Sequence, residues 1–73
     1  MDPIVFELRG DHITLDALLK AAGLASSGGD AKTLIQQGGV LVNGEVDLRR
    51  GRKLRAGDEV AVGGRKVELR AGA

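Results

Sequence analysis

The segment Val40–Arg55, VLVNGEVDLRRGRKLR, decides the fold expected for this chain of 73 residues. A short aliphatic run, Val40–Val42, leads into Asn43-Gly44, the dipeptide that most readily occupies the two positive-φ positions of a type I′ hairpin turn. Glu45–Leu48 then alternates acidic and apolar residues, which is typical of a strand with one solvated face. The segment therefore predicts a β-hairpin.

Five cations follow this hairpin within seven residues: Arg49, Arg50, Arg52, Lys53 and Arg55. Like charges at this spacing repel one another, so we expect them to stabilise the folded chain only when an anion binds. The charge density favours a polyanion-binding surface, and a solvated loop is the alternative. The distribution of charge along the chain also favours a localised basic surface. Residues 32–73 carry nine bases and five acids, whereas residues 1–31 carry two bases and five acids.

Before the hairpin, the sequence predicts a strand and a helix. In residues 4–9, Ile4, Phe6 and Leu8 alternate with Val5, Glu7 and Arg9, as expected for a strand with one buried face. Leucines at helical spacing between Leu15 and Ala22 predict a helix, with the Thr14 hydroxyl as its N-terminal cap. Gly23 and Leu24 fit the glycine and the apolar contact of a Schellman ending.

A second, shorter helix is expected from Ser27 to the Gly38-Gly39 pair. Ser27 and Asp30 have the spacing of a capping box, in which the Asp30 carboxylate accepts a hydrogen bond from the Ser27 amide. Lys32 is expected beside the apolar stripe, half exposed. The core-facing stripe itself is expected to consist of Ala31, Leu34 and Ile35.

After the basic run, a second hairpin is expected. Residues 56–58 predict a turn, and two alternating segments around Val60 and Val67 are joined by Gly63-Gly64. The order strand, helix, helix, strands predicts an α+β domain, with two helices packed on one side of a small, mostly antiparallel sheet. We expect residues 1–73 to form a single domain.

Catalytic and metal-binding side chains are scarce. The chain has no Cys, Tyr or Trp, and its one histidine, His12, lies in an expected turn. No two acids are spaced as an acid–base dyad, so we expect no enzyme activity, no metal and no cofactor. The amino terminus lacks a long apolar run, and together with the absence of cysteine this predicts a cytoplasmic protein.

Two features indicate how a phosphate-rich partner would be bound. Gly28-Gly29 would let a phosphate approach bare amides at the start of the second helix, with Lys32 one turn further on. The alternative is that the helix begins later and the glycines belong to a loop. Because Phe6 is the only aromatic residue, stacking on splayed bases is not expected. Structured RNA, contacted through its phosphates and shape, suits the composition, which does not exclude DNA.

These residues resemble a known family. The stretch from Leu15 to Gly44, with S-G-G-D-A-K followed by V-N-G-E-V-D-L-R-R-G-R-K-L-R-A-G-D, is similar to the RNA-binding domain named after ribosomal small-subunit protein four. The short stand-alone bacterial members of this S-four domain, or alpha-L motif, are the most similar, over about residues 15–62. The resemblance implies RNA binding, a ribosome-associated or ribosome-assembly role, and no enzymatic activity.

Residues and resemblance together predict a monomeric protein that binds structured RNA, with ribosomal RNA as the expected target. The family often has Arg after the serine that begins the second helix, where this chain has Gly28, so that contact is not carried over. The expected RNA-binding residues are Ser27, Gly28, Gly29, Lys32, Arg49, Arg50, Arg52, Lys53 and Arg55.

Two alternatives belong to other functional classes. The pieces V-N-G-E-V and L-R-A-G-D-E-V-A-V also resemble β-grasp sulfur carriers, but this chain ends Ala71-Gly72-Ala73 instead of in the Gly-Gly that such carriers activate. The other alternative is a protein-interaction module whose cations dock on an acidic partner.

Overall fold

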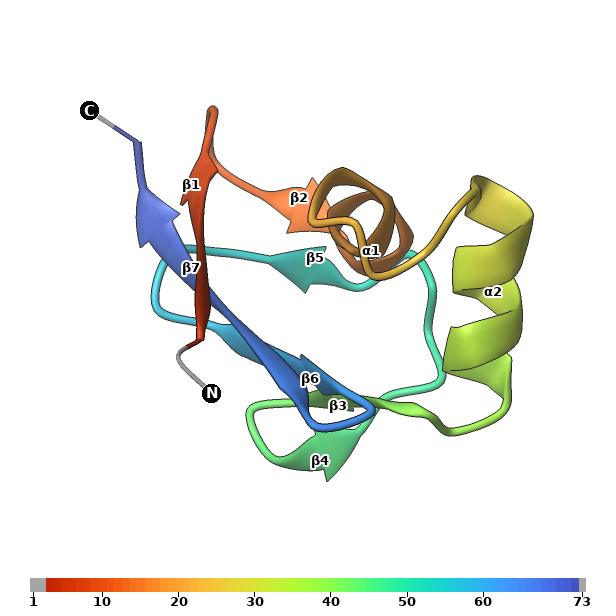
Figure 1. Cartoon of the computed structure of the whole chain (residues 1–73). Coiled ribbons are helices and arrows are strands. Elements are labelled where there is room, and N and C mark those ends of the chain that lie inside the picture. The colour runs from red at the N-terminus through yellow and green to blue at the C-terminus, as the bar shows by residue number, and fades with distance from the viewer. Residues whose placement is uncertain (1–2, 73) are drawn as a thin grey trace.

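The computed structural model describes residues 3–72, in which two helices pack beside a twisted sheet (Figure 1). The predicted α+β class, with a mostly antiparallel sheet, is confirmed. In chain order the elements are β1 (Ile4–Leu8), β2 (Ile13–Thr14), α1 (Leu15–Ala21), α2 (Gly28–Gln36), β3 (Val40–Val42), β4 (Glu45–Val46), β5 (Lys53–Leu54), β6 (Glu59–Val62) and β7 (Arg65–Ala71).

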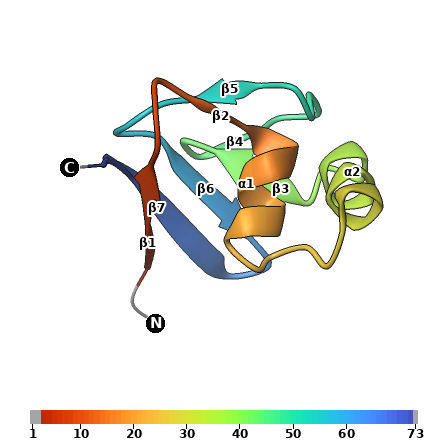
Figure 2. The same cartoon turned by 90° about the horizontal axis from the view of Figure 1, so that it is seen from above.

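Five strands form the main sheet, in the order β1-β7-β6-β3-β4. The outer strand β1 runs parallel to β7, from Ile4 opposite Val67 to Leu8 opposite Ala71. The remaining neighbours are antiparallel. Both helices lie to one side of this sheet (Figures 1 and 2), so each central strand has one face toward the helices.

The core fills the space between the helices and the sheet. Alternation along β6 and β7 buries Val60, Val67 and Leu69, as the second predicted hairpin requires. Ala31 and Ile35 of α2 are buried as predicted, whereas Leu34 is only half-buried. The largest fully buried side chains are Leu15, Leu18, Leu19, Ile35, Leu54, Val40, Val60 and Val67.

The predicted type I′ turn of the first hairpin is confirmed, with positive φ angles of 52° at Asn43 and 85° at Gly44. The Asn43 side chain also joins two turns, because its Nδ2 donates to Asp58 Oδ1 at 3.1 Å and its Oδ1 accepts from the Glu59 amide at 2.9 Å. The hairpin is therefore tied to the turn that begins β6.

The return strand of this hairpin is shorter than predicted, and its expected alternation of buried apolar and exposed acidic residues is not observed. Strand β4 ends at Val46, two residues before the expected end at Leu48. Val46 and Leu48 are 55% and 60% exposed, while Asp47 between them is only 7% exposed. The alternation of acidic and apolar residues predicted that this segment pairs as a strand. It did not predict that Asp47 would be buried by its ion pairs.

A second, two-stranded sheet was not predicted. Strand β2 pairs antiparallel with β5, placing Ile13 opposite Leu54 and Thr14 opposite Lys53. Leu54, the one large apolar residue within the basic run, is fully buried. Its burial explains why part of the basic run is a strand and not a loop.

The N-terminus of α1 is capped differently from the prediction. The Thr14 hydroxyl donates to Asp16 Oδ1 at 2.7 Å and accepts no helix amide, so its assignment as the side-chain cap is wrong. The C-terminal prediction is confirmed. Gly23 has a φ of 77°, and the Leu24 amide donates to the Leu19 carbonyl, which is the long hydrogen bond of a Schellman motif.

Helix α2 begins at Gly28, so the alternative in which Gly28-Gly29 precede the helix is wrong. Ser27 Oγ accepts from the Asp30 amide at 3.1 Å, as a capping serine does. The reciprocal bond is shifted by one residue from the prediction, because the Asp30 carboxylate accepts from the Ser26 amide at 3.0 Å instead of the Ser27 amide.

Candidate nucleic-acid interface

The cations Arg49, Arg50, Arg52, Lys53 and Arg55, here called the basic strip, begin in a tight turn and continue into β5. The Arg52 amide donates to the Arg49 carbonyl at 3.1 Å, which closes a turn with Arg50 and Gly51 at its tip. Arg50, in this turn, is exposed.

The backbone of the strip is anchored to the start of α1. The Leu15 amide donates to the Arg52 carbonyl at 2.9 Å, and the Asp16 amide donates to the Arg50 carbonyl at 3.1 Å. First-turn amides of a helix need acceptors from outside the helix, and here the strip supplies them in place of Thr14. Because of these bonds, the strip is held on the helix and not on a free loop.

Asp47 is the internal counterion of the strip. Its Oδ2 accepts from Arg49 Nη2 at 3.0 Å and from Arg52 Nη1 at 2.9 Å. Its Oδ1 accepts from the Arg49 amide at 2.9 Å and from Arg49 Nε at 3.1 Å. The expectation that all five cations stabilise the fold only with a bound anion is therefore wrong for Arg49 and Arg52.

The other three cations keep their full charge available. Within residues 3–72, the side chains of Arg50, Lys53 and Arg55 form no ion pair, and all three residues are exposed. The Arg55 amide, though not its guanidinium, donates to Asp58 Oδ2 at 2.8 Å. The strip thus combines two tethered arginines with three unpaired cations.

These contacts shift the pKa of two carboxyl groups in the same direction. Hydrogen bonds from the Arg49 side chain, opposed by burial and reinforced by the Arg49 amide and Arg52, lower the pKa of Asp47 from 3.8 to about 2. The Arg55 amide and the Asn43 side chain lower the pKa of Asp58 despite its partial burial. The ionised form of each group therefore favours the folded state more than its protonated form does.

Acid should weaken the fold through Asp47. A folded-state pKa below the unfolded value gives stability that is present above about pH 5 and is lost as pH falls toward about 2. Because the arginine partners are partly solvated, we expect Asp47 to contribute about 1–2 kcal/mol. Urea unfolding should show wild type more stable than Asp47→Asn by that amount at pH 6, with the difference shrinking toward pH 2.5.

The Asp47→Asn variant retains Asp58, so comparing it with wild type removes the acid sensitivity that both proteins share. A difference in the free energy of unfolding that stays constant between pH 6 and pH 2.5 would contradict this role of Asp47.

The predicted α2 contacts lie at the same end of the molecule as the turn between β4 and β5. Both views place this turn and α2 away from the two termini (Figures 1 and 2). Lys32 is exposed, more than the half exposure predicted. In the part of the chain that the structure describes, no hydrogen bond or ion pair joins Ser27–Gly29 or Lys32 to the strip.

Glycine leaves the start of α2 sterically open. A Cβ at Gly28 would meet no heavy atom within 4 Å, and one at Gly29 would lie 3.9 Å from Ser27 Oγ. The Asp30 carboxylate nevertheless occupies this helix end by accepting from Ser26. A phosphate bound there would meet a negative charge, so the strip offers the stronger attraction for an anion.

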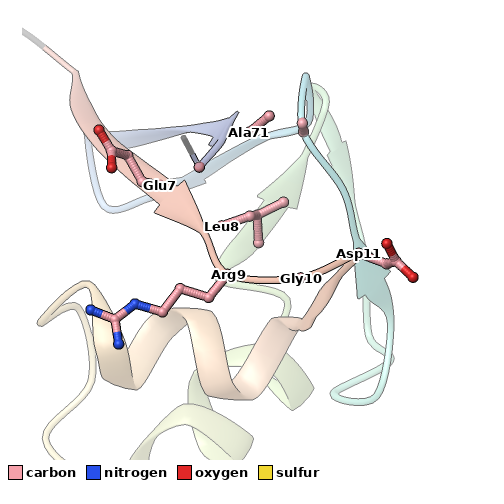
Figure 3. A pocket seen from close by; sticks show the side chains of 8 residues that line it. Glu7, Leu8, Arg9, Gly10, Asp11 and Ala71 are labelled. Carbon is pink, nitrogen blue, oxygen red and sulfur yellow. The ribbon is translucent and has the colours of Figure 1, made fainter.

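A separate hollow of about 570 Å³ lies where β1 and β7 end (Figure 3). Its lining carries one cation, Arg9, and two acids, Glu7 and Asp11. This mixed charge does not favour a polyanion.

His12, close by in sequence, is exposed between β1 and β2, as the predicted turn requires. Within residues 3–72 no helix has the length and apolar character to cross a membrane.

Asp47 is the important residue that the sequence reasoning did not assign. The sequence does place this acid two residues before Arg49 and five residues before Arg52, and a tight turn brings residues at these separations into contact. The role of Asp47 was not predicted because the alternation over Glu45–Leu48 assigned its side chain to the solvated face of a strand.

Comparison with known proteins places this architecture in a family. Residues 6–70 match the model of the S4 domain, the S-four domain of the sequence resemblance. A Bacillus subtilis protein named "Probable ribosome maturation protein RlbA" is 52% identical over 54 residues, covering 74% of this chain and 76% of the relative.

The Escherichia coli relative named "Putative RNA-binding protein YbcJ" is 40% identical over 58 residues, which cover 80% of this chain and 83% of the relative. The solution structure of YbcJ, described as revealing an alfaL motif involved in RNA-binding, superposes with a TM-score of 0.75 at 36% identity. That superposition covers 97% of this chain and 91% of YbcJ. These matches support the S-four resemblance over the sulfur-carrier alternative.

Proposed function

This chain belongs to the S4 domain family, and we propose that it is an RNA-binding protein whose main contact surface is the basic strip. The observation that carries the proposal is the strip itself, which is held on the start of α1 and contains two tethered arginines and three cations that form no ion pair within residues 3–72. Cations anchored in this way can meet phosphates at fixed positions, which suits a folded RNA.

The partner we propose is structured ribosomal RNA. The name of the Bacillus subtilis relative, at 52% identity, supports a role in ribosome maturation. The composition supports contact with phosphates and helix shape, because Phe6 is half-buried against the core and leaves no aromatic ring for base stacking. We further propose that the whole chain acts as one RNA-binding domain, a cytoplasmic monomer without catalytic activity, whose motif core is residues 15–62.

The start of α2 is proposed as an accessory contact, through the amides of Ser27, Gly28 and Gly29 and the exposed Lys32. The openness of both glycines supports it, while the neighbouring Asp30 carboxylate limits the attraction for phosphate. The accessory contact can be tested separately from the strip because the two surfaces share no hydrogen bond within residues 3–72.

Alanine at Gly28 or Gly29 should stabilise α2 and weaken RNA binding. Neither glycine has a positive φ, so alanine fits and should raise the free energy of unfolding by up to about 1 kcal/mol at each site. If a phosphate approaches these amides, the added methyl group should lower RNA affinity several-fold. Urea unfolding and an RNA titration measure the two effects.

Gln36→Ala, at the exposed far end of the same helix, is the matched control and should change neither quantity by much. Alanine variants of both glycines that bind RNA as tightly as wild type would remove Ser27–Gly29 from the contact surface.

The proposed function is tested by titrating the pure protein against ribosomal RNA fragments with stable helices, duplex DNA and an acidic protein. We expect the structured RNA to bind most tightly at the same salt concentration. Preference for the acidic protein would instead support the interaction-module alternative, with the basic strip as its docking face.

A further inference from the structure

Asp47 has a role beyond neutralising charge. It is the one buried charged side chain within residues 3–72, and its backbone amide donates to the Val40 carbonyl of β3 at 3.2 Å. All four hydrogen bonds to its carboxylate come from the basic strip. The carboxylate therefore connects the strip rigidly to the main sheet.

The two arginines that Asp47 holds differ in exposure. The side chain of Arg49 is 71% exposed although its Nε and Nη2 both donate to Asp47, and the Arg52 side chain is 32% exposed. A long side chain at such exposure would otherwise sample many rotamers. The paired hydrogen bonds fix the plane of the Arg49 guanidinium and leave part of it open to a ligand.

We propose that Asp47 is a positioning residue that makes the basic strip select structured RNA over flexible polyanions, a proposal that rests on the proposed RNA-binding function. A single strand adapts its phosphates to any cluster of cations. The phosphates of an A-form helix have fixed spacing, so donors that are already oriented lose less conformational entropy when they bind it.

Charge and positioning make opposite predictions for the same variant. Asp47→Asn removes one negative charge from the strip, so electrostatics alone predicts tighter binding to every polyanion. The variant also replaces Oδ2, the acceptor for Arg49 Nη2 and Arg52 Nη1, with an amide donor or forces the side chain to turn. Positioning therefore predicts weaker binding to structured RNA in spite of the gained charge.

Glu45→Gln supplies the matched control. Glu45 lies beside the same arginines in a hollow shared with Asp47, yet within residues 3–72 its exposed side chain forms no hydrogen bond or ion pair. The substitution changes the charge by the same amount and leaves the arginines tethered. It should raise the affinity for both kinds of polyanion together.

The experiment measures affinity for a stable ribosomal RNA hairpin and for poly(U) at one salt concentration, using wild type, Asp47→Asn and Glu45→Gln. We expect Asp47→Asn to lower the ratio of hairpin to poly(U) affinity about tenfold, the size expected when two long side chains must be ordered on binding. An unchanged ratio in Asp47→Asn, with both affinities raised as in Glu45→Gln, would overturn the positioning role.

A measurement without RNA separates this proposal from the proposed function. In wild-type protein the Arg49 Nε–H should give a resolved NMR signal that is protected from solvent exchange. In Asp47→Asn its chemical shift should move to that of solvent-exposed arginines and the protection should be lost. An unprotected Nε–H in wild type would overturn the positioning proposal, whether or not the protein binds RNA. Failure of wild type to bind either RNA, with Nε–H protected, would overturn both the proposed function and the selectivity assigned to Asp47.

Discussion

Reversing the charge of Arg50 and Lys53 together, as Arg50→Glu and Lys53→Glu, should abolish measurable RNA binding and leave the fold intact. Both residues are exposed, and within residues 3–72 neither side chain forms an ion pair. The variant loses two phosphate contacts and adds two repulsive charges, so we expect affinity to fall about 100-fold or more at low salt. The free energy of unfolding should change by no more than about 0.5 kcal/mol.

Arg52 is deliberately left unchanged in this experiment. Sequence alone made Arg50 and Arg52 equivalent candidates, but glutamate at position 52 would face the Asp47 carboxylate and confuse lost binding with lost stability. The matched control reverses Arg9 and Arg65, which lie outside the strip and are exposed. It causes the same change in net charge and should weaken RNA binding far less. Equal losses in both variants would show that net charge, and not the strip, determines affinity.

Truncation of Leu18 should have the largest effect on stability. Leu18 lies on the inner face of α1 and is fully buried in the core, so Leu18→Ala should lower the free energy of unfolding by about 2–5 kcal/mol through lost burial and a cavity. In a chain of this size, such a loss approaches the whole stability of the fold. The midpoint of urea unfolding, followed by circular dichroism, measures the effect.

Leu48→Ala removes the same atoms from a side chain that is 60% exposed and should cost little. Leu34→Ala should fall between the two, because Leu34 is half-buried and not fully enclosed as its place in the apolar stripe predicted. A Leu18→Ala protein as stable as the Leu48→Ala protein would contradict the position of the core.

The parts of the fold that the sequence predicted correctly depend on local chemistry. Asn43-Gly44 adopts the positive φ angles that a type I′ turn needs, and Gly23 ends α1 for the same backbone reason. Apolar spacing identified the buried faces of both helices and of β6 and β7. These signals act over a few residues, so they can be read without knowing which elements meet.

The parts that the sequence did not predict depend on contacts between distant segments. The Arg50 and Arg52 carbonyls cap α1 from more than thirty residues away, which no capping pattern near Thr14 reveals. Strand β5 exists because Leu54 reaches the core beside β2. Asp47 is buried because the turn brings two arginines back to it, and the alternation expected over Glu45–Leu48 is therefore lost.

The candidate site was predictable as a set of residues but not as an arrangement. Charge density alone identified the five cations of the strip. Only the structure divides them into two tethered arginines and three cations without an ion pair among the described residues. This division changes the expected electrostatics. Asp47, Arg49 and Arg52 together carry a single net positive charge, so the strip offers about four effective charges to phosphate instead of five.

The salt dependence of RNA affinity tests the central claim most directly. For a stable ribosomal RNA hairpin titrated from low to physiological salt, about four neutralised phosphates should give a slope of log affinity against log salt near −3 to −4. The Arg50→Glu and Lys53→Glu double variant should flatten that slope by about two if binding remains measurable. A wild-type protein that binds no RNA at low salt, or binds it with a slope near zero, would contradict an RNA-binding surface made by the basic strip.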